Sequence, residues 1–112
     1  MTYLDKNKYD KLKTLGQILK EARESENLLL RQVAAAINAD TAMISKFEKG
    51  ERKPTREQIG LLAKALKLEE KALLISYLSD KVASDLAGED VAKEALKAAE
   101  KKIDILKKKH DK

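Results

Sequence analysis

The sequence predicts an all-α protein, and three observations support this fold class. Apolar residues make up 43% of the 112-residue chain, but aromatic residues only 4%, and most of the apolar residues are Leu, Ala and Ile. These residues recur at helical spacing along most of the sequence. Short segments that contain Asn, Asp, Gly or Pro separate the periodic stretches. A chain of this length can hold one small domain and an appendage.

The segment 28–54 is the most informative part of the chain, because it predicts two short helices joined by a tight turn and followed by a basic loop. The apolar face of the first helix is formed at helical spacing by Val33, Ala34 and Ile37. Asn38 tolerates a left-handed backbone, and Asp40 can cap the helix that follows. That second helix is expected at about Thr41 to Lys49, and the glycine that ends it is Gly50.

The second helix has two different faces. Its packed side is formed by Ile44, Phe47 and Glu48, and its small, polar side by Thr41, Ala42, Ser45 and Lys46. A helix with a packed back and a shallow polar front suits the DNA major groove, which is about 12 Å wide. A merely solvated helix face is the alternative interpretation.

Four runs of residues, taken together, resemble the helix-turn-helix of the Xre/lambda-repressor/Cro family of regulators. They are Leu30 to Ala34, Ile44 to Gly50, Glu51 to Pro54, and Leu61 to Leu66. The resemblance covers roughly residues 14–75. It implies a five-helix lambda-repressor-like DNA-binding domain, and double-stranded DNA as the partner.

The resemblance also implies roles for individual residues. The positions that usually face base edges are Thr41, Ala42, Ser45 and Lys46. The loop after the second helix resembles the family's backbone-clamping loop, and the phosphate contacts expected there are Lys49, Arg52 and Lys53. A solvated run of charges is the alternative for this loop. Arg23 is implied to pair with Glu48, with two solvated surface charges as the alternative.

The start of the first helix of the motif departs from the family pattern. Leu29 occupies a position where a Ser or Thr cap is typical. Without another capping group, the helix start is expected to be weaker by roughly 1 kcal/mol. Arg31 and Gln32 remain as candidate phosphate contacts, because backbone N–H groups at a helix N-terminus favour anions.

Four further helices are expected, and they divide the chain. Thr14 and Gln17 form a capping box at the start of a helix that extends to Asn27. Thr55 caps a helix that ends at Leu66, a long helix ends near Ala87, and a last helix follows. The predicted divisions are an N-terminal arm (1–13), a DNA-binding domain (14–68), a C-terminal helical oligomerisation segment (69–107) and a basic tail (108–112).

Both C-terminal helices carry an apolar stripe, which must be buried against something. They can fold on each other as a hairpin or pair with a second chain, and we favour a homodimer. The residues expected to form the dimer contact are Leu74, Tyr77, Leu78, Val82, Leu86, Val91, Ala95, Ala99 and Ile103. Residues 69–100 have four lysines against eight acidic residues, so they should point away from phosphates.

Composition and motifs argue against several other classes. The chain has no cysteine, no metal-ligand cluster, no Gly-rich phosphate loop and no nucleophile placed beside a base, so we expect no catalysis, no metal and no cofactor. No apolar run is long enough to cross a membrane, which favours the cytoplasm. The leading hypothesis is a sequence-specific transcriptional regulator. It would repress as a homodimer on an inverted repeat. The size and the helical extension are compatible with a controller protein of a restriction-modification system or a phage-type repressor. A protein-interaction module or an antitoxin with this fold is the alternative.

Overall fold

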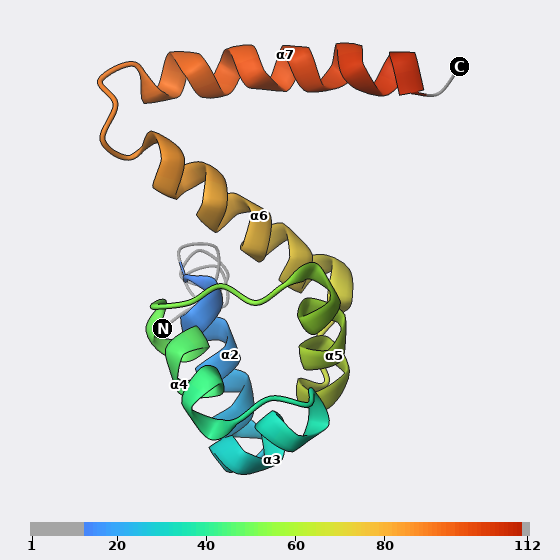
Figure 1. Ribbon diagram of the computed structural model, residues 1–112. Coiled ribbons are helices and arrows are strands. Elements are labelled where there is room, and N and C mark those ends of the chain that lie inside the picture. The colour runs from blue at the N-terminus through green and yellow to red at the C-terminus, as the bar shows by residue number, and fades with distance from the viewer. Residues whose placement is uncertain (1–12, 111–112) are drawn as a thin grey trace, which may run out of the picture. The chain divides into compact units, whose positions relative to one another are not determined.

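A computed structural model describes residues 13–110 of the chain, and this part contains six helices and no strand (Figure 1). The helices are α2 (Leu15–Ser25), α3 (Leu30–Ala36), α4 (Thr41–Lys49), α5 (Arg56–Leu66), α6 (Glu70–Leu86) and α7 (Ala92–His110). The predicted all-α class is therefore confirmed. The predicted N-terminal arm, apart from Lys13, and the last two residues of the basic tail lie outside the described residues.

The chain divides into two compact units at Asp80. In the described residues, the first unit contains α2 to α5 and the part of α6 that ends at Asp80, and the second begins at Lys81. The sequence predicted that the DNA-binding domain ends at residue 68, which lies before α6 and before the end of the first unit at Asp80. The first unit extends further because Leu73 of α6 is 2% exposed and belongs to its hydrophobic core.

The helices begin at local capping signals. Thr14 and Thr55 each form a capping box with the glutamine three residues later, as the sequence predicts for Thr14. Asp40 Oδ1 accepts a hydrogen bond from the Met43 backbone N–H at 2.8 Å and so caps α4. At α3, where Leu29 offers no side-chain acceptor, Gln32 Oε1 accepts from the Leu29 backbone N–H at 2.7 Å. A second group thus partly satisfies the helix start that the sequence predicted to be weak.

Four left-handed residues end or separate these helices. Gly50 has φ 77°, and Asn27 and Asn38 have φ 56° and 55°, as expected for residues that tolerate this conformation. Lys67 is also left-handed, with φ 57°, although it is neither Gly nor Asn. The Leu68 N–H donates to Ala63 O at 2.9 Å behind it, which closes the end of α5.

The hydrophobic core of the first unit lies between α2, α3, α4 and α5, which pack on one another. The most deeply buried side chains are Phe47, Ile59, Leu62 and Val33. Phe47 comes from α4, Ile59 and Leu62 come from α5, and Val33 comes from α3. The core therefore holds α4 from behind, on the side opposite its polar front.

Gly16 allows α2 and α4 to approach closely. A Cβ atom at this position would lie 2.5 Å from Glu48 O and 2.7 Å from Phe47 O, both of which are backbone atoms of α4. Real side chains do not make such short contacts. Only glycine therefore fits here without displacing the end of α4.

Asp80 connects α6 to the start of α2. Its Oδ2 atom accepts a hydrogen bond from the Leu15 backbone N–H at 2.8 Å, across 65 residues of sequence. The first turn of a helix has backbone N–H groups without helical partners, and a carboxylate there is also favoured by the helix dipole. Asp80 therefore fixes this part of α6 on the first unit.

The helix α7 has no buried residue. It extends through His110, so residues 108–110, which the sequence assigned to the basic tail, are helical. Lys107, Lys108, Lys109 and His110 make up its last turn, where positive charge is favoured by the helix dipole. In residues 13–110, no helix has the length and apolar character of a membrane span.

Candidate nucleic-acid interface

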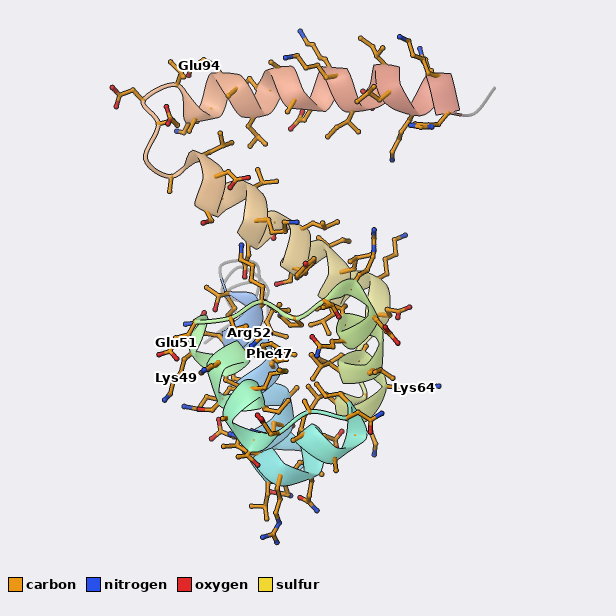
Figure 2. The ribbon with its side chains drawn as sticks, viewed as in Figure 1. Phe47, Lys49, Glu51, Arg52, Lys64 and Glu94 are labelled. Carbon is orange, nitrogen blue, oxygen red and sulfur yellow. The ribbon has the colours of Figure 1, made fainter. Side chains whose placement is uncertain are left out.

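The back of α4 is fixed by apolar contacts. Ile44 and Phe47 are each 2% exposed, and α4 packs on both α2 and α3. Figure 2 shows Phe47 pointing into the interior of the first unit, whereas Lys49 extends outward from the end of α4. Because the back is buried, only one face of this short helix can meet a ligand.

The front of α4 contains the four residues that were predicted to read bases. Thr41, Ala42 and Lys46 are exposed, and Ser45 is partly exposed. They occupy positions i, i+1, i+4 and i+5, which lie on one side of a helix with 3.6 residues per turn. The structure therefore brings one ammonium group, two hydroxyl groups and one methyl group to a single face.

An ion pair ties this helix to α2. Arg23 Nε donates to Glu48 Oε2 at 2.7 Å, and Arg23 Nη2 donates to Glu48 Oε1 at 3.2 Å. The side chains of Arg23 and Glu48 are 15% and 8% exposed, so the pair implied by the resemblance is present and largely buried. The hydrogen bond to Glu48 raises the pKa of Arg23, while burial acts in the opposite direction.

The same arginine also holds the connection before α3. Arg23 Nη1 donates to the backbone oxygen of Leu28 at 3.0 Å. One guanidinium thus contacts both the residue that leads into α3 and the penultimate residue of α4. The bidentate geometry makes this contact more specific than a lysine could.

The loop after α4 folds back on the end of that helix. The backbone N–H groups of Glu51 and Arg52 lie 2.9 and 3.4 Å from Lys46 O, and both donate to it. Pro54 is buried and anchors the far end of the loop, whereas Arg52 and Lys53 are exposed. Their cationic side chains are therefore carried by a constrained backbone beside the front of α4.

Positive charge dominates this surface. From Lys46 to Arg56 the chain has five basic residues against the two carboxylates of Glu48 and Glu51. Arg23 neutralises Glu48. None of the five basic side chains forms an ion pair with another described residue. Such a surface attracts phosphates.

The two candidate phosphate contacts on α3 differ in their surroundings. Arg31 is exposed and extends from the first turn of the helix. Gln32 is exposed too, but its Oε1 atom already accepts the Leu29 N–H. Gln32 therefore has a structural task, and only its amide N–H groups remain for a phosphate.

Met43 is half-buried against the core. Gln58 Nε2 donates to Met43 Sδ at 3.6 Å. This contact connects α4 to α5. Gln58 also completes the capping box of α5, so one glutamine supports the start of α5 and the side of α4.

The predicted dimer residues fall into two groups. Leu74 and Tyr77 pack against the core of the first unit, so they face inward. In the other group, Leu78, Val82, Val91, Ala95 and Ile103 are exposed, and Leu86 and Ala99 are partly exposed. The sequence interpretation did not name Ile75 and Leu96, which are 59% and 43% exposed. Periodicity gave the right helices but did not distinguish the face that meets the core from the free face.

The described residues contain no group of three or more His, Asp or Glu side chains that could hold a metal ion. A surface cavity of about 460 Å³ is lined by residues of α5 and α6 that include Gly60, Leu61, Lys64 and Glu70. Its lining does not include any residue of α4 or of the basic loop. The candidate interface is therefore separate from this cavity.

The packed helix pair α3 and α4, with its exposed polar front, defines a helix-turn-helix protein. A sequence model of the helix-turn-helix family matches residues 19–73. C.AhdI, a restriction-modification controller protein from Aeromonas hydrophila, is 30% identical with a TM-score of 0.50, and the match covers 53% of this chain and 86% of that one. This chain belongs to the helix-turn-helix family.

Two further solved structures have a similar fold. The clp gene regulator ClgR from Corynebacterium glutamicum is 26% identical with a TM-score of 0.52, over 70% of this chain and 83% of that one. The P22 c2 repressor, solved in complex with a synthetic operator, is 22% identical with a TM-score of 0.54, over 57% of this chain and 97% of that one. No curated protein sequence matches the chain.

Proposed function

We propose that this protein binds operator DNA as a cytoplasmic homodimer and represses transcription by occupying an inverted repeat, without catalysis. The protein is a DNA-binding transcriptional regulator, in keeping with its helix-turn-helix family and its similarity to a controller protein and a gene regulator. The observation that carries the finer proposal is the front of α4. It is a polar face on a helix whose back is fixed by the core and by the ion pair between Arg23 and Glu48.

The proposed mechanism separates sequence reading from positioning. Lys46 donates to guanine O6 or N7, Thr41 and Ser45 donate or accept hydrogen bonds, and the Ala42 methyl contacts a thymine methyl. Arg52, Lys53, Lys49 and Arg31 contact phosphates, which orient the protein without carrying sequence information. The constrained loop supports this division, because its backbone is tied to the last turn of α4.

A dimer is proposed because one helix of this length makes few base contacts. Two copies related by a two-fold axis read two half-sites, about 10 bp apart from centre to centre. Occupying such a site at a promoter excludes the transcription machinery. The described residues that remain exposed on α6 and α7 offer apolar surface for this assembly.

Selection of the purified protein against a random duplex pool tests the proposal. We expect enrichment of an inverted repeat whose half-sites lie about one helical turn apart. Enrichment of a single half-site would contradict the dimer but keep the DNA-binding function. No enrichment at low salt would contradict sequence-specific binding itself.

Variants at Lys46 and Arg52 test the assigned roles. We expect Lys46→Ala to weaken binding to the selected operator by about 1–3 kcal/mol and to relax the preference at one base pair. Arg52→Ala is expected to weaken binding to all duplexes alike and to reduce the salt dependence by about one phosphate contact. Fluorescence anisotropy titrations at several salt concentrations measure both effects. A uniform loss for Lys46→Ala would remove its role as a base reader.

A further inference from the structure

Two apolar stripes are exposed on the C-terminal helices. On α6, Ile75, Leu78 and Val82 are 59%, 42% and 43% exposed. On α7, Leu96, Ile103 and Leu106 are 43%, 50% and 55% exposed, and Ala99 lies between them. The residues of both stripes are separated by steps of three and four, which is the spacing of two helices that pack side by side. α6 and α7 have similar lengths, 17 and 19 residues.

The charges of these helices are complementary. Residues 69–90 contain two lysines against six acidic residues, whereas residues 101–110 contain five lysines against one aspartate. Pairing α7 with another α7 in parallel would bring two basic ends together. Pairing α6 with another α6 would bring two acidic segments together. An antiparallel pairing of α6 with α7 places the acidic segment beside the basic one.

We propose that the exposed stripe of α7 packs antiparallel against the exposed stripe of α6 from a second copy of this chain. In this arrangement Lys108 and Lys109 of one protomer lie near Glu69 and Glu70 of its partner, and the helix dipoles are opposed. Because the contact is reciprocal, the dimer contains two such helix pairs, and the stripes of both α6 helices and both α7 helices are covered. This inference rests on the proposed function. An inverted repeat needs two reading helices, one from each of two copies, so we assign the contact to a second copy and not to the same chain.

Two isoleucines of α7 provide a matched test by sedimentation velocity. Ile103 belongs to the stripe, whereas Ile105 is offset from it by about 200° around the helix and is 57% exposed. We expect Ile103→Asp to raise the dimer dissociation constant by about tenfold or more, because it places a charge in an apolar contact. Ile105→Asp should leave that constant unchanged. Equal effects of the two variants, or a wild-type protein that stays monomeric at the highest soluble concentration, would overturn the proposal.

Disulfide trapping identifies the partner helix, since the natural chain has no cysteine. Leu78→Cys and Ile103→Cys proteins are mixed and oxidised, with Ile105→Cys replacing Ile103→Cys as the control. A covalent heterodimer in the first mixture and none in the control supports α6 pairing with α7 of the partner. Trapped Ile103→Cys homodimers without heterodimers would overturn it, as would an internal disulfide in a monomeric protein that carries both cysteines.

DNA binding separates this inference from the proposed function. Ile103→Asp is expected to keep binding to a single half-site while losing the added affinity for the inverted repeat. A wild-type protein that dimerises through these helices but binds no duplex would overturn the proposed function and leave the contact standing. If the Ile103→Asp protein binds the inverted repeat as a dimer as tightly as the wild-type protein does, the contact alone is overturned.

Discussion

Glu48 is the carboxylate that neutralises Arg23 in a largely buried site, where the two side chains are 8% and 15% exposed. Glu48→Ala would leave the guanidinium without its partner, and we expect the free energy of unfolding to fall by about 3 kcal/mol. Urea denaturation followed by circular dichroism measures this loss. Glu51→Ala, at an exposed position of the adjoining loop, is the control and should change stability little. Equal losses in the two variants would contradict a structural role for the pair.

Two helical glycines offer a second test at the residue scale. Gly16→Ala would place a Cβ atom 2.5 Å from Glu48 O, a backbone atom, and we expect a loss of about 1–3 kcal/mol. A new Cβ at Gly60 would contact the carboxylate of Glu70, and this flexible side chain can rotate away. Gly60→Ala is therefore expected to be neutral or to stabilise α5 by up to about 1 kcal/mol. Thermal denaturation of both variants checks the difference, and a tolerated Gly16→Ala would contradict the close approach.

The residue scale also shows which details were predictable. The caps at Thr14, Asp40 and Thr55 could be predicted, because a cap depends on residues within one helical turn of each other. Gly16 was not singled out, because its necessity comes from the backbone of α4, which lies more than 30 residues away in sequence. The capping role of Gln32 was missed as well, although the spacing of a glutamine three residues after the cap was a usable signal.

At the scale of the elements, α6 depends on one long-range hydrogen bond in addition to the burial of Leu73. Asp80→Ala would remove the acceptor for the Leu15 N–H, and we expect a loss of about 1 kcal/mol in the unfolding free energy. Asp85→Ala, further along the same helix at an exposed position, is the matched control. Chemical denaturation of the two variants distinguishes them. The same small change in both would mean that the carboxylate of Asp80 contributes nothing beyond a surface charge.

The helices themselves were predicted with boundaries close to those observed, because apolar periodicity and capping residues agree along the chain. The role of each face was harder to predict. In α4 the pattern separated the buried residues from the polar front. In α6 the sequence assigned Leu74 and Tyr77 to the dimer contact, whereas they pack against the core and the neighbouring Ile75 is exposed. Adjacent apolar residues point in different directions on a helix, so their sequence alone does not identify the covered one.

At the scale of the whole molecule, the two units should differ in what they contribute. Because α7 has no buried residue, a chain ending at residue 90 should keep the core of the first unit and its unfolding free energy within about 1 kcal/mol. The same truncation is expected to reduce binding to an inverted repeat to the level of a single half-site. Denaturation and anisotropy titrations test these outcomes. Loss of folding on truncation would show that α7 stabilises the first unit.

The sequence by itself determined the all-α class, the position of the helix-turn-helix, the capped helix starts and the residues on the polar front of α4. These features depend on local spacing and on side-chain chemistry within a few turns of helix. Tertiary structure decided which residues of α6 complete the core, why Gly16 cannot carry a side chain, and how Asp80 reaches the start of α2. These contacts join segments that are distant in sequence, and only packing of the folded chain brings their atoms together.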